Sequence, residues 1–134
     1  MGSAESGQSG NETLYTRMVP ILFMTDVAAE RDFYVKLGFR VSYEGPEYPD
    51  FIALAYGSLE FGIEQSSQFG VEYPNRVLTW QLGVGDVDAA KERLTEAEIE
   101  FREEWMTPRE DWRYRVLHCK TPNNYHLMLE GPNE

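Results

Sequence analysis

Residues 18–41, MVPILFMTDVAAERDFYVKLGFRV, set the pattern for the whole chain. Residues 18–24 form an apolar run that predicts a strand. Asp26 follows, and its short side chain can accept a hydrogen bond from an unpaired backbone N–H at a helix start. Apolar residues at near-helical spacing continue through 27–37 with charged residues between them, and Gly38 stands where such a helix ends. The stretch therefore predicts a strand, a capped amphipathic helix and a second strand.

The same order of elements returns later in the chain. Residues 77–84 (VLTWQLGV) predict a strand, Asp86 stands before a second helical segment at 87–97, and residues 99–102 predict the next strand. The dipeptides Asp26-Val27 and Asp86-Val87 lie 60 residues apart. An internal repeat of this kind indicates two half-domains of one design.

Period-two alternation predicts a strand at residues 59–64. In residues 59–64 (LEFGIE) the apolar Leu59, Phe61 and Ile63 alternate with Glu60, Gly62 and Glu64, which is typical of a half-buried strand. Further strands are expected over residues 39–43, 51–56, 100–105, 114–119 and 125–130, with a loop through Thr107-Pro108.

The two ends of this pattern resemble a known superfamily. Residues 19–41 are similar to the opening of the vicinal oxygen chelate superfamily, which includes glyoxalase I, extradiol dioxygenases, and fosfomycin and bleomycin resistance proteins. Residues 112–130 (WRYRVLHCKTPNNYHLMLE) resemble its last hairpin, although Arg113 replaces a Gly and the turn reads Thr-Pro-Asn-Asn. The resemblance implies an α+β fold of paired βαβββ modules, each curling its sheet around a shared cavity.

The resemblance also implies the domain organisation and an assembly. We expect a disordered tail at residues 1–15, because residues 1–11 are small, polar and rich in Gly and Ser, and a single domain at residues 16–131. Its modules would span residues 16–66 and 76–131, joined by a linker at 67–75. Because modules of this superfamily often complete their cavities with a partner chain, we expect a homodimer.

Composition limits the partners. The 134 residues carry 23 acidic and 12 basic side chains, for a net charge of −11. This balance disfavours nucleic acid, whose binding needs clustered Lys and Arg, and it would concentrate a cationic ligand as well as aid solubility. No apolar run is long enough to span a bilayer. Cys119 is the only cysteine, so no internal disulfide can form and a cytoplasmic location is expected.

The metal-ligand positions of the superfamily are occupied here by unsuitable residues. The resemblance places them at Val19 and Thr79 on the first strand of each module, and at Glu60 and Met128 on the last strands. A catalytic ion needs about three protein ligands with oxygen, nitrogen or thiolate donors, and Val and Met supply none of these usefully. We therefore expect no metal and no other cofactor.

A cavity without an ion resembles the bleomycin-resistance-like branch, whose members bind a toxic compound and withhold it. We expect a small aromatic or cationic amphiphilic ligand, with antibiotic resistance as the outcome. Trp105 and Trp112 bracket the polar residues 106–111, and we expect them to close over a flat ligand. The predicted ligand-binding residues are Val19, Ile21, Phe23, Glu60, Thr79, Gln81, Trp105, Trp112, His126 and Met128.

Two alternatives remain open at this stage. The first is an enzyme of the glyoxalase and dioxygenase superfamily, a lyase, isomerase or cyclase, with Glu60 or His126 as general base. The second is an interaction or regulatory module with no small ligand, whose cavity would be filled by side chains.

Overall fold

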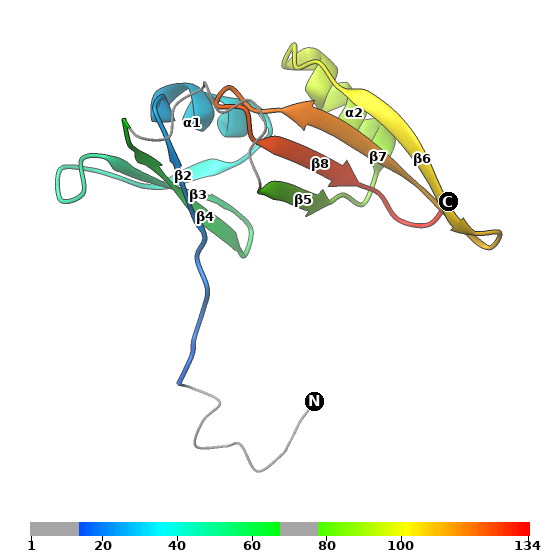
Figure 1. The fold of residues 1–134 in the computed structure, drawn as a ribbon, viewed down its shortest axis with the longest axis horizontal. Helices are drawn as coiled ribbons and strands as arrows, with labels where there is room; N and C mark the ends of the chain where they lie inside the picture. Colours follow the sequence, from blue (N-terminus) through cyan, green and yellow to red (C-terminus); the bar gives the residue numbers. More distant parts are fainter. Residues whose placement is uncertain (1–13, 68–77) are drawn as a thin grey trace.

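The computed structural model describes residues 14–67 and 78–134, which form two modules of the same construction (Figure 1). The first module contains β1 (Ile21–Met24), α1 (Val27–Lys36), β2 (Arg40–Glu44), β3 (Phe51–Tyr56) and β4 (Leu59–Gln65). The second contains β5 (Thr79–Gly83), α2 (Val87–Glu96), β6 (Arg102–Arg109), β7 (Trp112–Lys120) and β8 (His126–Glu130).

Each module builds one four-stranded mixed sheet. The strand orders are β1-β4-β3-β2 and β5-β8-β7-β6, so the first strand of each module lies beside the last. That pair is parallel in both sheets, whereas the other neighbours are antiparallel. The predicted α+β fold of paired βαβββ modules is confirmed.

The repeat extends to the ends of the helices. Asp26 accepts a hydrogen bond from the Ala29 N–H at 3.1 Å, and Asp86 accepts one from the Ala89 N–H at the same distance. Beyond α1 the chain turns at Gly38 with φ of 107°, a conformation that glycine adopts without steric cost. The corresponding position beyond α2 is Glu98, with φ of 59°. The local signals predicted from the sequence therefore position both helices.

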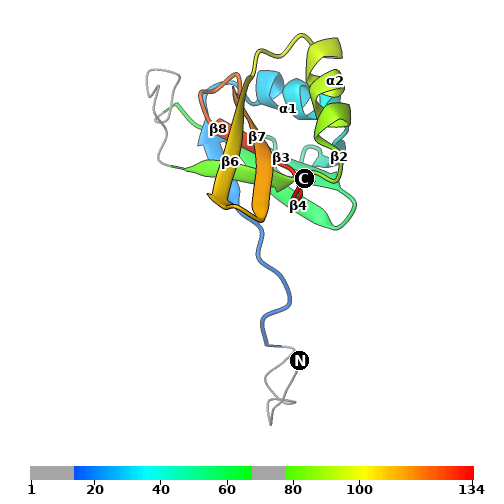
Figure 2. The ribbon, with the colours of Figure 1, turned by 90° about the vertical axis from the view of Figure 1, so that its right-hand side faces the viewer.

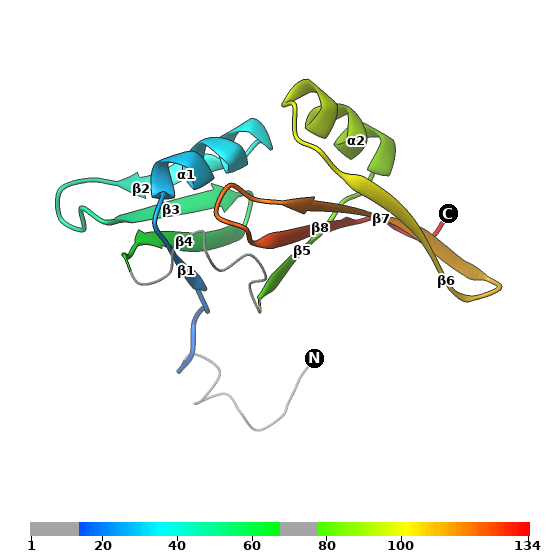
Figure 3. The ribbon, with the colours of Figure 1, turned by 45° about the horizontal axis from the view of Figure 1, so that its top comes forward.

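Both helices lie over the same side of the two sheets (Figures 2 and 3). Along β1, Leu22 and Met24 are buried, whereas Ile21 and Phe23 on the other face remain 46% and 40% exposed. We call the sheet faces turned away from the helices the open faces. The open face of the first sheet carries Ile21 and Phe23, two of the predicted ligand-binding residues.

One hydrophobic core joins the modules. It contains side chains from both, and the Phe61 ring meets the Trp80 ring edge to face at a centroid distance of 5.2 Å. A hydrogen bond also joins the modules: the Tyr125 hydroxyl of the second module donates to the Phe23 carbonyl of the first at 2.7 Å. Asn123, in the turn between β7 and β8, is fully buried against the start of α1.

The prediction of a loop at residues 106–111 is wrong. β6 continues to Arg109 and β7 begins at Trp112, so only a tight turn separates them. Pro108 is tolerated in β6 because the pairing register shifts between Met106 and Arg109, and because β6 is the edge strand of its sheet. At a bulge on an edge strand, strand pairing does not need the backbone N–H that proline lacks.

Two predicted segments, the tail and the linker, are hardly covered by the described residues. The predicted tail at residues 1–15 and linker at 67–75 lie almost entirely outside the described residues. Neither of the ten-residue helices in the described ranges is long and apolar enough to cross a membrane.

Candidate functional site

A hollow on the open face of the first sheet gathers exposed apolar side chains. Its volume is about 450 Å³, and Ile21, Tyr48 and Phe51 form its apolar walls. Tyr48 is 67% exposed, and the Tyr43 ring lies 6.0 Å from it and 6.2 Å from Phe51. We call this hollow the acidic cup; its lining residues are Ile21, Glu47, Tyr48, Pro49, Asp50, Phe51 and Glu64.

Carboxylates surround the cup. Glu47 accepts a hydrogen bond from the Tyr43 hydroxyl at 2.9 Å, which holds the β2–β3 loop over the sheet. Within residues 14–67 and 78–134, neither Asp50 nor Glu64 forms an ion pair with a basic side chain. The cup therefore combines apolar walls with negative charge that a bound cation could neutralise.

Gly62 leaves the space that the Phe51 ring occupies on this face of the sheet. Gly62 on β4 pairs with Ile21 on β1 and Ala53 on β3, and a Cβ atom added to it would collide with the Phe51 ring. The absence of a side chain lets that ring rest on the sheet. Ile21 and Phe23 lie on the same open face, as predicted, with the half-buried Val19 just before β1.

Glu60 lies on the same open face, away from the cup. Its carboxylate accepts hydrogen bonds from the Arg17 guanidinium and from the Ser42 hydroxyl, each at 3.1 Å. Both oxygens are therefore occupied, and Glu60 is a poor match for the predicted general base.

The open face of the second sheet carries the other predicted residues. Thr79 pairs with His126 across β5 and β8, and Gln81 pairs with Met128. The structure thus brings the predicted ligand-binding residues Thr79 and His126 side by side on neighbouring strands. Two residues that were not among the predicted site residues, Glu104 and His118, extend this group.

A continuous polar chain crosses three strand boundaries here. The Glu104 carboxylate lies 2.8 Å from His118 Nε2, and His118 Nδ1 lies 3.0 Å from His126 Nε2. The two imidazoles are stacked, with planes 12° apart, and His126 Nδ1 lies 3.4 Å from the Thr79 hydroxyl. We call Glu104, His118, His126 and Thr79 the histidine relay.

The surroundings of the relay keep His126 neutral near pH 7. Burial lowers the pKa of His126, and its electrostatic interactions with His118, Lys120 and Arg102 lower it further. Lys120 pairs with His126, and Arg102 pairs with His118. A neutral imidazole at this position can accept a proton.

The predicted tryptophan pair is separated. Trp105 lies opposite Arg115, and its indole stacks on the Arg113 guanidinium, whose carbon is 3.9 Å from the ring centroid. Trp112 instead lies beside Tyr114, with ring centroids 5.9 Å apart. Because successive side chains of β7 point to opposite faces, the two indoles lie on opposite faces of the β6–β7 hairpin.

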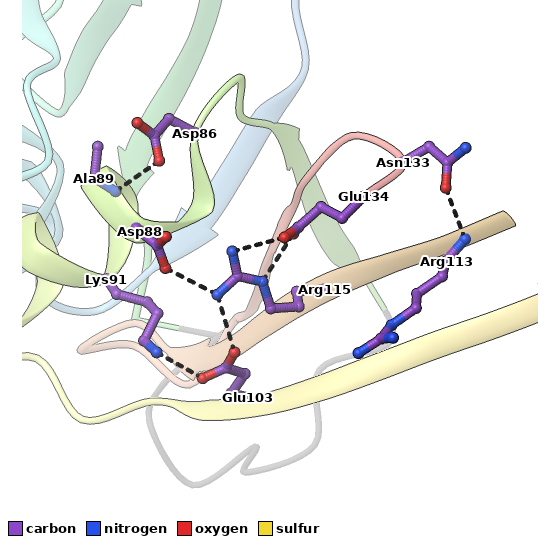
Figure 4. A network of polar contacts seen from close by, with 9 residues as sticks. All are labelled: Asp86, Asp88, Ala89, Lys91, Glu103, Arg113, Arg115, Asn133 and Glu134. Atoms are coloured by element: carbon purple, nitrogen blue, oxygen red, sulfur yellow. Dashed lines mark hydrogen bonds and ion pairs between the residues drawn. The ribbon is translucent and has the colours of Figure 1, made fainter.

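Figure 4 shows the polar contacts of Arg115, whose guanidinium carbon lies 5.3 Å from the centroid of the Trp105 ring. Arg115 donates to Asp88 on α2 at 2.9 Å and to both carboxylate oxygens of Glu134 at 2.8 and 3.0 Å. Lys91 on α2 forms an ion pair with Glu103 at 2.9 Å. A site on the open faces would therefore include Trp112 and not Trp105.

The donor set does not fit a catalytic metal. Val19 and Met128 offer no suitable donor, and the Glu60 carboxylate is held by Arg17 and Ser42. In the part of the chain that the structure describes, no three His, Cys, Asp or Glu side chains are grouped to hold an ion. Burial raises the pKa of the Cys119 thiol to about 11, so this thiol stays protonated near neutral pH.

Comparison with known proteins bears on the fold. No protein-family model and no curated protein sequence matches the chain. Among solved structures, a glyoxalase/bleomycin resistance protein/dioxygenase from Alicyclobacillus acidocaldarius superposes with a TM-score of 0.72. It is 16% identical, and the match covers 92% of this chain and 96% of that one. The chain has the vicinal oxygen chelate fold.

Two further structures with this fold are those of binding proteins. TnmS3, an antibiotic binding protein from Streptomyces sp. CB03234, has a TM-score of 0.65 and 23% identity over 88% of this chain and 98% of its own. A bleomycin-binding protein in complex with bleomycin has a TM-score of 0.66 and 17% identity over 90% and 100%. At these sequence identities the similarity shows that the chain shares the fold of these proteins. It does not show that the chain binds their ligands.

Proposed function

We propose that the protein binds an amphiphilic aromatic cation in the acidic cup and withholds it from its target, as in antibiotic or toxin sequestration. The observation that carries this proposal is the exposure of Ile21 and Tyr48 next to the Asp50 and Glu64 carboxylates. Burying apolar surface contributes roughly 25 cal/mol per Å². A flat cation would cover this surface and neutralise the carboxylates in one step.

Two further properties support a cationic guest. The net charge of −11 attracts cations over a distance of about one Debye length, roughly 10 Å at moderate salt. The side chains of Tyr48 and Phe51 offer aromatic faces, and a cation over such a face gains about 0.5–1 kcal/mol at exposed sites. The antibiotic binding and bleomycin-binding proteins that share the fold are consistent with this use of it.

The test uses 9-aminoacridine, a planar cation, and bleomycin as probes in titration calorimetry. Phe51→Ala should weaken binding by about two- to tenfold, because ring stacking contributes roughly 0.5–1.5 kcal/mol beyond area burial. Glu64→Gln should weaken binding of the cation and reduce its dependence on salt, whereas binding of uncharged acridine should change little.

Trp105→Ala is the matched control, because it removes a larger aromatic side chain on the other side of the β6–β7 hairpin. The proposal fails if Phe51→Ala and Trp105→Ala weaken binding equally, or if neither probe binds. In a sensitive bacterium, tolerance should rise in proportion to the amount of protein, since sequestration is stoichiometric. Consumption of the compound far beyond the molar amount of protein would favour catalysis instead.

The proposed assembly is a homodimer. Ile21 and Phe23 remain 46% and 40% exposed on β1, at the edge of the first sheet, and a second copy could cover part of this surface. Sedimentation at micromolar concentration should give a species of twice the chain mass. A sharp 15.5 kDa monomer would contradict the dimer and leave the binding proposal standing.

An enzyme is the second candidate function, and the histidine relay favours it. Of the two general bases predicted, His126 can take a proton from the Thr79 hydroxyl, which lies 3.4 Å from its Nδ1, whereas Glu60 is held by Arg17 and Ser42. A module without any ligand fits less well, because the acidic cup is open.

A further inference from the structure

The Glu104 carboxylate, at one end of the histidine relay, determines which atom donates and which accepts in each of its hydrogen bonds. An ionised carboxylate only accepts, so His118 Nε2 carries the proton that it donates to Glu104. In a neutral His118, Nδ1 is then an acceptor, and His126 Nε2 must donate to it. His126 Nδ1 is left with a lone pair, and the Thr79 hydroxyl lies 3.4 Å away.

This order matches the requirement for an activated hydroxyl nucleophile. Such a site needs a nucleophile next to a base, and a third group that orients the base. Separations are often longer in unliganded proteins than during the reaction. We propose that Thr79 is a nucleophile for acyl transfer, that His126 is its general base, and that His118 and Glu104 are positioning residues.

The groove beside the relay indicates the class of substrate. It has a volume of about 700 Å³, and Phe33, Ile99 and Phe101 provide apolar surface next to His118 and His126. Arg102 and Lys120 line the same groove together with Glu98 and Glu100, and these two cations flank the histidines, because Arg102 pairs with His118 and Lys120 with His126. We therefore assign carboxylic esters with an apolar acyl group, whose developing oxyanion these cations would stabilise.

The step balances within the residues present. The Thr79 oxygen attacks the ester carbonyl carbon while its proton passes to His126 Nδ1. The imidazolium that forms is stabilised by Glu104 through His118, and the C–O bond to the leaving group then breaks as His126 returns the proton to it. Water, deprotonated by the same nitrogen, later hydrolyses the acyl-threonine ester and restores the Thr79 hydroxyl.

The test follows hydrolysis of 4-nitrophenyl butyrate by the full chain. We expect a burst of nitrophenolate, a mass increase of one butyryl group, and a modified peptide that contains Thr79. Thr79→Val, which keeps the side-chain shape, should abolish acylation, and Thr79→Ser should retain it. His126→Gln should lower the acylation rate by about 100-fold or more. Thr107→Val is the matched control, since it removes an exposed threonine of β6 outside the relay.

The dependence of the acylation rate on pH tests whether His118 and Glu104 position His126 or only support the fold. The rate should rise with pH as His126 loses its proton, in a field set by Arg102 and Glu104 on β6, His118 and Lys120 on β7, and Glu130 on β8. His118→Gln and Glu104→Gln should lower the rate and change this profile while the circular dichroism spectrum and thermal melt stay unchanged.

Three results would overturn the assignment. They are a rate no higher than that of free imidazole at equal concentration, acylation confined to Lys120, or an unchanged burst in Thr79→Val. None of them bears on the acidic cup, because the relay lies on the second sheet and Phe51 and Glu64 lie on the first. Calorimetric binding of 9-aminoacridine therefore tests the binding proposal separately.

Discussion

Replacing Asn123 by Ala is expected to lower the free energy of unfolding by about 3 kcal/mol, because it removes three hydrogen bonds of a buried side chain. Its side-chain amide donates to the Asp26 carbonyl at 2.8 Å and to the Glu30 carboxylate at 2.9 Å. Its side-chain oxygen accepts from the Asp26 N–H at 3.1 Å. Asn123 and Glu30 are both buried, so water cannot replace these bonds without entering the core.

Equilibrium unfolding in urea, followed by circular dichroism, measures this loss. Asn133→Ala is the matched control, because the Asn133 side-chain oxygen also accepts a backbone N–H, that of Arg113 at 2.8 Å, but in an exposed position (Figure 4). We expect the control to lose less than about 1 kcal/mol. An equal decrease in the free energy of unfolding in both variants would show that burial of the Asn123 hydrogen bonds adds no stability.

Phe61→Ala is expected to have a larger effect, a loss of about 4 kcal/mol in the free energy of unfolding, because it opens a cavity in the shared core. The buried Phe61 ring lies 4.9 Å from Tyr34 and 5.8 Å from Phe39 in its own module. It also lies 5.2 Å from Trp80 in the other module. Its removal should therefore loosen the junction between the two modules.

Fluorescence can report that loosening at one residue. The chain has three tryptophans, so Trp105→Phe and Trp112→Phe together leave Trp80 as the only indole. In that background Phe61→Ala should shift Trp80 emission to longer wavelength in the folded protein. Phe51→Ala is the matched control on the open face, and it should leave the emission unchanged. A red shift in both variants, or in neither, would contradict a specific Phe61–Trp80 junction.

Much of the fold follows from signals that act over a few residues. A helix cap depends on a side chain and an N–H three residues away, so Asp26 and Asp86 mark their helices without help from the rest of the chain. Strand alternation is equally local, and it correctly separated Ile21 and Phe23 from the buried Leu22 and Met24. The 60-residue repeat then implied two modules of one construction.

The candidate sites depend on contacts between distant residues. The bulge between Met106 and Arg109 arises in the pairing of β6 with β7, and it accompanies the separation of Trp105 from Trp112. The histidine relay joins Glu104 and His118 to His126 diagonally across strands, and only the observed register brings them together. The sequence by itself thus determined the order of elements and the open faces, because those signals are local. Only the tertiary structure decided which side chains meet, because register and bulges are set by strand pairing over long sequence separations.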